Sequence, residues 1–214
     1  MRKSIAQMIA PSTPGKVSAR SIATQIPNVL IHEIIDGKPY YRKGYRDVLA
    51  KTKTVEDIMG SSSLQAFLIT YLTIWIGKQI HEHKYHILTS EAGLHLDRKN
   101  NLAGDLLIFD SGKLTIDKIN KNYASVPPLI SIEVDIDIAL EDLTAHSYIN
   151  LKTRKLLDFG TEKVIWFLTE SKKVMVATHD DEWQSFDWNY DVEILDGITC
   201  NVGQYLKDKG SEFA

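Results

Sequence analysis

Two short apolar segments of this 214-residue chain each carry carboxylates where a buried strand is expected. Asp105 lies inside the first segment, residues 102–109, and Glu133 lies inside the second, residues 129–135. A carboxylate on a central strand is costly to bury unless it binds a cation or a proton. Side chains alternate between the two faces of a strand, so Asp105 and Glu133 can approach each other if the two strands are neighbours. We therefore predict that these two carboxylates share one divalent cation.

Hard oxygen atoms are the ligands that magnesium prefers, usually one or two carboxylates completed by water and substrate phosphate. The backbone carbonyl of Val134 directly follows Glu133 and is a candidate for a further ligand. Asp135 closes the second segment, where it is either a third ligand or an exposed residue at the end of the strand. The predicted cofactor is Mg²⁺ or Mn²⁺, and the predicted ligands are Asp105, Glu133, Val134 and Asp135.

A lysine on a predicted helix completes this group. Residues 142–159 are expected to form the helix, with Gly160 as its C-terminal stop. At about 100° per residue, Lys152 falls in the middle of an apolar stripe, and a buried ammonium needs a partner or a task. Lys155 lies at the edge of that stripe and remains the alternative. An ammonium beside a metal-activated water can stabilise charge on a scissile phosphate. The members of the stripe are Tyr148, Ile149, Leu156 and Phe159.

The remaining elements must hold these side chains in place. Residues 29–41 predict a β-hairpin, because the Asp-Gly pair at 36–37 suits a tight primed turn. A helix is expected to begin at the serines 61–63 and to bury apolar residues as far as Ile80. Strands are expected over residues 85–96 and, paired as a hairpin, over residues 163–178. This order indicates an α/β or α+β fold with a mixed sheet.

Three other polar positions have less specific interpretations. Glu33 lies in the first strand of the hairpin and could approach the metal, but we expect a solvent-exposed glutamate there. Gln65, near the start of the first long helix, is a candidate for a contact behind the ligands. The histidines 81 and 83 are expected to lie at a solvated helix end.

Composition limits the class of protein. The chain is long enough for one domain with a sizeable core, and residues 28–214 are the expected domain. Residues 1–27 are rich in Ser, Thr, Ala, Pro and Gly, which predicts a mobile N-terminal arm. Cys200 is the single cysteine, which excludes an internal disulfide framework and fits the reducing cytoplasm. No apolar run is long enough to span a bilayer, so no membrane partner is expected.

The formal net charge of −3 gives no global basic field that would by itself indicate nucleic-acid binding. It does not exclude such binding either, because a bound divalent metal can supply positive charge locally.

In their order along the chain, these motifs resemble the PD-(D/E)xK nuclease superfamily, and within it the Uma2 family of proposed endonucleases, formerly a bacterial domain of unknown function. The resemblance covers the chain from residue 29 to the C-terminus. It rests on the following segments: His32-Glu-Ile-Ile-Asp-Gly37, the helix beginning near Ser62, Ala103-Gly-Asp105, Ile132-Glu-Val134, Lys152 with Gly160 downstream, and residues 192–198.

The resemblance implies a restriction-endonuclease-like core, a mixed β-sheet flanked by helices and preceded by the N-terminal hairpin. It implies a Mg²⁺-dependent endonuclease that hydrolyses DNA phosphodiester bonds, with Asp105 and Glu133 as ligands and Lys152 as the catalytic amine. A homodimer follows by analogy, because two sites are the simplest way to cut both strands.

The sequence also departs from the family pattern. Gly104 replaces the usual proline before the aspartate, and Asp135 stands where the standard motif places its lysine. Asp135-Ile-Asp137 replaces the usual Ser-Pro continuation. An inactive module that binds nucleic acid or protein on the same fold is therefore the alternative function. A metal hydrolase that does not act on nucleic acid is a third hypothesis.

Overall fold

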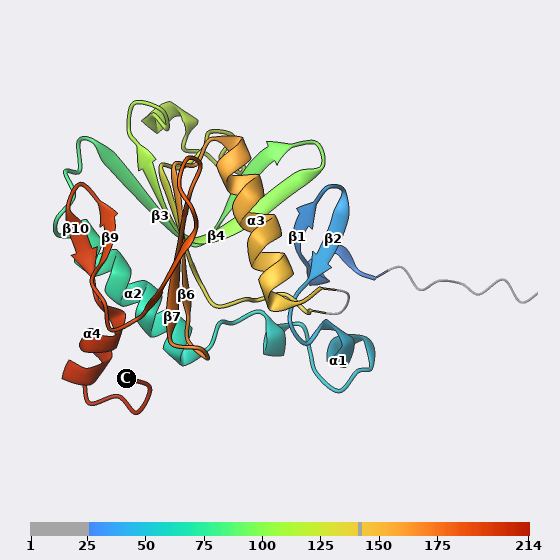
Figure 1. Cartoon of the computed structure of the whole chain (residues 1–214). Coiled ribbons are helices and arrows are strands. Elements are labelled where there is room, and N and C mark those ends of the chain that lie inside the picture. The colour runs from blue at the N-terminus through green and yellow to red at the C-terminus, as the bar shows by residue number, and fades with distance from the viewer. Residues whose placement is uncertain (1–25, 141–142) are drawn as a thin grey trace, which may run out of the picture.

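The computed structural model of the protein describes residues 26–140 and 143–214. The predicted arm over residues 1–27 lies outside the described residues, except for its last two positions. Figure 1 shows a twisted sheet with helices on both sides, which confirms the predicted mixed sheet flanked by helices.

An eight-stranded sheet forms the centre of the described structure. Seven of its strands follow one another in the order β2-β1-β4-β5-β6-β7-β8, and the eighth, β3, pairs with β4 alone. The pairing of β5 with β6 is parallel and the other pairings are antiparallel. A separate two-stranded sheet follows. The strands are β1 (Ile31–Ile35), β2 (Lys38–Tyr41), β3 (Tyr85–Asp97), β4 (Asn100–Asp110), β5 (Ile130–Val134), β6 (Lys163–Leu168), β7 (Lys173–Thr178), β8 (Gln184–Asp187), β9 (Val192–Leu195) and β10 (Ile198–Cys200).

The N-terminal hairpin has the turn that its sequence predicts. Asp36 and Gly37 both adopt positive φ angles, 53° and 76°, as a primed two-residue turn requires. The Asn100 side chain accepts a hydrogen bond from the Asp36 backbone N–H at 2.8 Å. The hairpin is thereby tied to the start of β4.

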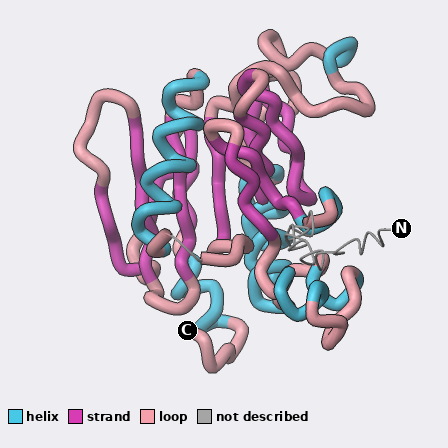
Figure 2. The backbone as a smooth tube through the Cα atoms, turned by 90° about the vertical axis from the view of Figure 1, so that its right-hand side faces the viewer, coloured by secondary structure: helices cyan, strands magenta, loops and turns pink. Residues whose placement is uncertain are grey.

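Two long helices cover opposite faces of the sheet (Figures 1 and 2). Helix α2 (Ser63–Gly77) begins at the N-cap Ser62, one of the three serines predicted for this role. Helix α3 (Ala145–Phe159) begins at Thr144, whose side chain accepts a hydrogen bond from Ser147 N–H, and ends at Gly160 with φ 113°. The predicted start of this helix at residue 142 lies outside the described residues. Two shorter helices are α1 (Tyr45–Leu49) and α4 (Val202–Asp208).

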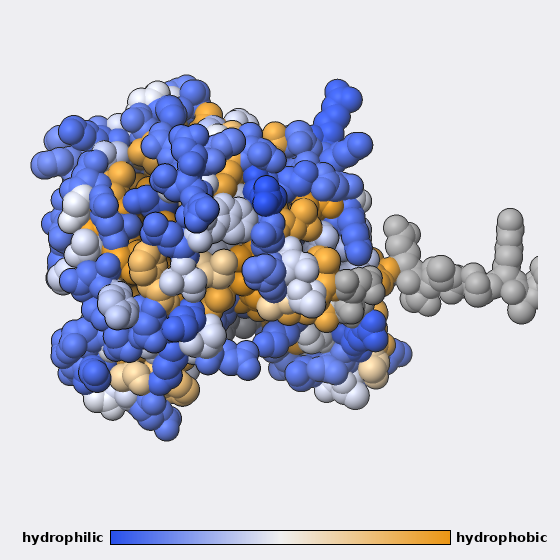
Figure 3. Space-filling model, in the orientation of Figure 1, coloured by the Kyte–Doolittle hydropathy of each residue, from blue (hydrophilic) through white to orange (hydrophobic). Residues whose placement is uncertain are grey.

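The strands bury different residues on their two faces. Leu106 and Ile108 of β4 join the core under α2, whereas Leu107 and Phe109 join the core under α3. The surface in Figure 3 is mostly hydrophilic, with hydrophobic residues visible between the polar ones. Among the described residues, no helix is both long and apolar enough to cross a membrane.

Candidate active site

The two carboxylates singled out from the sequence lie side by side on neighbouring strands. The antiparallel register pairs Leu106 with Ile132, and its continuation sets Asp105 opposite Glu133. The backbone N–H of Val134 donates a hydrogen bond to Asp105 Oδ2 at 2.7 Å. Asp105 is 8% exposed and Glu133 is 3% exposed, so both carboxylates are buried.

Lys152 of α3 joins this pair from the face of the sheet. Its Nζ lies 2.9 Å from Glu133 Oε2, 2.7 Å from Glu33 Oε1 and 2.7 Å from the Ala103 carbonyl oxygen. An ammonium has three N–H donors, so these contacts use all of them. Lys155 instead pairs with Asp36 near the surface, at 2.6 Å. Of the two candidate lysines, Lys152 is the one beside the carboxylates.

Glu33 is not the solvent-exposed glutamate that we expected. The side chain is 1% exposed, and it bonds to Lys152 Nζ, to the Tyr148 hydroxyl at 2.5 Å and to the Ala103 N–H at 3.1 Å. The prediction was wrong because β1 pairs with β4 as well as with β2, which makes β1 an inner strand. Ile35, two residues further along β1, is buried in the core under α3, and this alternation is the signal that pointed to a buried Glu33.

Burial and neighbouring charges shift the pKa values of these groups. Burial, together with the negative charge of Glu133, raises the pKa of Asp105 to about 8, although the hydrogen bond from Val134 N–H acts to lower it. Burial also raises the pKa of Glu133, which Lys152 offsets only in part. Burial acts to raise the pKa of Glu33 as well, but Lys152, His32 and the Tyr148 hydroxyl together hold it below its usual range. Burial acts to lower the pKa of Lys152, yet Glu133 and Glu33 hold it well above the ordinary value.

The donor set of the site suits a hard divalent cation. Three buried carboxylates, those of Glu33, Asp105 and Glu133, surround one buried ammonium, that of Lys152. Asp105 Oδ1 receives no hydrogen bond from the described residues, so this oxygen remains available as a ligand. Among the described residues, no group of three or more His, Cys, Asp or Glu side chains is arranged to hold a metal ion, either in this site or elsewhere. Asp105 and Glu133 would therefore hold a cation whose other ligands are water and substrate oxygens, as Mg²⁺ commonly has.

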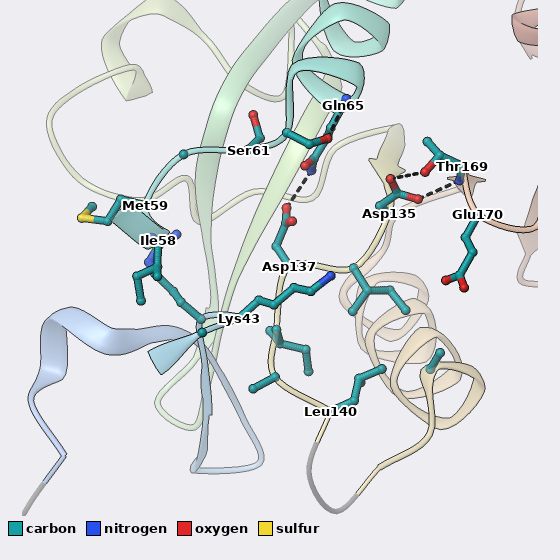
Figure 4. Close-up of a pocket in the computed structure, with 18 of the residues that line it drawn as sticks. Lys43, Ile58, Met59, Ser61, Gln65, Asp135, Asp137, Leu140, Thr169 and Glu170 are labelled. Carbon is teal, nitrogen blue, oxygen red and sulfur yellow. Dashed lines mark hydrogen bonds between the residues drawn. The ribbon is translucent and has the colours of Figure 1, made fainter. Parts of the chain in front are cut away.

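The other two predicted ligands make different contacts. The Val134 carbonyl accepts a hydrogen bond from Gln65 Nε2 at 2.9 Å, and the same nitrogen lies 2.7 Å from Asp137 Oδ2. Gln65 is 3% exposed and thus lies behind the site, where the sequence suggested a supporting contact. The Asp135 carboxylate accepts hydrogen bonds from Thr169 N–H and Oγ1, each at 2.7 Å (Figure 4). Asp135 follows the last residue of β5 with a φ of 63°, and it still lines one small cavity with Asp105 and Glu133.

Two cavities lie in and beside this group of residues. A cavity of about 10 Å³ lies among Asp105, Glu133 and Lys152, which is room on the scale of one water or ion. A larger cavity of about 990 Å³ opens beside it and is shown in Figure 4. Both are lined by Asp135 and Asp137. The charged residues that line the larger cavity are Arg42, Lys43, Lys53, Asp57, Glu91, Asp135, Asp137 and Glu170.

Comparison with known proteins supports the fold assignment. No protein-family model matches the chain, and no curated protein matches it. Its structure is similar to the crystal structure of "a putative nuclease belonging to DUF820" from Anabaena variabilis, with a TM-score of 0.52 and 14% sequence identity. The likeness covers 76% of this chain and 80% of that chain. It is consistent with the resemblance to the Uma2 family, and at this identity it shows the fold: a mixed sheet flanked by helices, shared with that protein.

Proposed function

We propose that the protein is a divalent-cation-dependent endonuclease that hydrolyses DNA phosphodiester bonds, with Mg²⁺ or Mn²⁺ held by Asp105 and Glu133. One observation carries the proposal: β4, β5 and α3 bring Asp105, Glu133 and Lys152 together in a buried group. The structural likeness to a protein described as a nuclease supports it.

The charges of the site favour a cation. With all four groups ionised, Glu33, Asp105 and Glu133 carry three negative charges against the single positive charge of Lys152. An uncompensated buried charge is strongly unfavourable, and a divalent cation would balance this group. The larger cavity also contains more carboxylates than cationic side chains, so a phosphate there needs positive charge from a bound cation.

The residues of the chain have separate roles in this proposal. A bound divalent cation supplies an activated water and polarises a phosphoryl oxygen. Asp105 and Glu133 fix its position, and the hydrogen bonds from Val134 N–H and Ser131 Oγ orient these two carboxylates. Lys152 stabilises the negative charge that develops on the phosphate in the transition state.

The alternative, an inactive binding module, rests on the departures at Gly104 and Asp135. Asp135 stands at the motif position of the lysine, but the Lys152 ammonium donates a hydrogen bond to Glu133, and an amine beside this carboxylate supports an active site over a degenerate one. The proposal includes a cytoplasmic location, which the single cysteine favours, and a homodimer, which rests on analogy. Sedimentation velocity of the full chain would measure the oligomeric state.

Plasmid cleavage in Mg²⁺ or Mn²⁺ tests the proposal. We expect the wild type to cleave DNA and the double variant Asp105→Ala, Glu133→Ala to be inactive. Asp158→Ala, which removes an exposed carboxylate of α3, is the matched control and should cleave as the wild type does. Unchanged cleavage in the double variant would contradict the proposal. A parallel assay with a simple ester separates a nuclease from a hydrolase of another class.

A further inference from the structure

The three acceptors of Lys152 are not equivalent. Glu33 is held from both sides, since its Oε1 also accepts the Ala103 N–H and its Oε2 accepts the Tyr148 hydroxyl. The Ala103 carbonyl is part of the backbone of β4 and cannot move independently. Two of the three acceptors are therefore fixed parts of the scaffold.

Glu133 is the exchangeable acceptor. It lies opposite Asp105, whose like charge is unfavourable in a buried site unless a cation lies between the two groups. The oxygen that accepts from Lys152 is Oε2, while Oε1 accepts from Ser131 Oγ at 2.7 Å. A cation bound by Asp105 and Glu133 must therefore share Glu133 with Lys152.

We propose that Lys152 and the divalent cation compete for Glu133, and that Glu33 is the positioning residue that retains Lys152 while the cation draws Glu133 away. The inference rests on the cation site of the proposed function. Cation binding then frees one N–H of Lys152, which turns to the substrate phosphate. In the absence of the cation all three N–H groups are engaged, so the lysine has no donor for substrate.

The competition has a thermodynamic signature in cation affinity, apart from any cleavage. Removal of the Lys152 ammonium leaves Glu133 free for the cation and should tighten cation binding. Removal of the Glu33 charge makes the ammonium depend more on Glu133 and should weaken cation binding. The two variants therefore shift the affinity in opposite directions, whereas general damage to the site would weaken both.

Calorimetric titration of the metal-free full chain with Mn²⁺ tests the inference. We expect Lys152→Met to bind about tenfold more tightly than the wild type and Glu33→Gln about tenfold more weakly, a coupling of ordinary size. Glu91→Gln is the matched control, because Glu91 lines the same small cavity but binds Arg42 instead of Lys152. Glu91→Gln removes one negative charge, as Glu33→Gln does, and should change the Mn²⁺ affinity by less than about threefold.

Several results would overturn the inference. A shift in the same direction for Lys152→Met and Glu33→Gln would do so, as would an equal loss of affinity in Glu33→Gln and Glu91→Gln. If circular dichroism shows that Lys152→Met does not fold, the comparison of Glu33→Gln with Glu91→Gln alone decides.

The proposed function is tested separately by phosphodiester cleavage. Suppose that Lys152→Met binds Mn²⁺ more tightly and Glu33→Gln more weakly than the wild type, but that the wild type does not cleave DNA. This result would support the competition and contradict the proposed nuclease activity. Cleavage by the wild type without these two shifts in affinity would support the nuclease and contradict the competition. A wild type that binds no Mn²⁺ would contradict both.

Discussion

The two faces of the central sheet are built by the same strands and both bury an apolar core, but in the described structure only the face under α3 also buries a group of three carboxylates and a lysine. Under α2, β4 and β5 present Leu106, Ile108 and Ile132 to a cluster of buried apolar side chains. Under α3, the same two strands present Asp105 and Glu133 to a buried lysine. One residue step along a strand separates the two kinds of environment, because neighbouring side chains point to opposite faces.

The apolar residues under α2 and the charged residues under α3 should contribute differently to stability and to function. Burial of apolar side chains under α2 stabilises the fold by roughly 25 cal/mol for each Å² removed from water. Burial of charges under α3 costs desolvation free energy, which a buried ion pair often fails to recover. The polar group is therefore better explained by chemistry than by stability, and the two faces should respond differently to substitution.

Glu133→Gln should have the largest effect and should be confined to activity. The amide keeps the shape of the side chain but removes the charge of a metal ligand, so cleavage should fall on the order of a thousandfold. Initial rates of plasmid cleavage at saturating Mg²⁺ measure the loss, and circular dichroism checks the fold. A variant within tenfold of the wild-type rate would remove Glu133 from the active site.

Leu72→Ala should have the opposite profile. Leu72 is fully buried in the core under α2, and its truncation should lower the free energy of unfolding by about 2 to 5 kcal/mol. Ile74, on the same helix but 52% exposed, is the matched control, and Ile74→Ala should change stability by less than about 0.5 kcal/mol. Urea unfolding measures both values. Cleavage per folded molecule should be unchanged, and a large loss in Leu72→Ala would mean that the two faces are not separable.

Asp105→Asn should stabilise the metal-free protein, and the gain should depend on pH. The pKa of Asp105 is raised to about 8, so between pH 4 and pH 8 the native state holds a proton that the unfolded state has released. The wild type therefore loses stability as pH rises through this window, and the variant avoids that loss. We expect a gain of roughly 5 kcal/mol at pH 8 and little at pH 4.

Urea unfolding in chelator at several pH values measures this gain. Added Mg²⁺ should stabilise the wild type and not the variant, because the variant lacks one ligand. A gain that is independent of pH would show that Asp105 does not titrate in this range, and the assignment of Asp105 as a buried carboxylate with a raised pKa would fail.

Much of the fold could be predicted because its signals are local. The Asp-Gly turn of the hairpin, the N-cap Ser62 and the stop at Gly160 each depend on a few adjacent residues. The approach of Asp105 to Glu133 depends on the two strands being neighbours, and the register of β4 and β5 shows that they are.

The parts that could not be predicted depend on contacts distant in sequence. Glu33 is buried because β1 pairs with β4, some 65 residues later, and Tyr148 lies 115 residues from its partner Glu33. Asp135 has a positive φ, and its carboxylate accepts hydrogen bonds from Thr169, 34 residues later. The burial of Glu33 depends on the order of the strands, and the contacts of Asp135 depend on one backbone angle and a distant partner. The spacing of apolar residues in the sequence predicts none of these.

Lys155→Met should have the smallest effect, and it gives the sharpest comparison with the neighbouring lysine. Lys155 lies one turn from the polar group on the same helix, but its partner Asp36 is 61% exposed at the tip of the hairpin. Exposed pairs contribute about 0 to 1 kcal/mol and weaken with salt. We therefore expect less than about 0.5 kcal/mol of destabilisation, a difference that shrinks in 1 M NaCl, and unchanged cleavage. Loss of cleavage in Lys155→Met, with cleavage retained in Lys152→Met, would reverse the assignment of the amine and move the active site from the buried face of α3 to its edge.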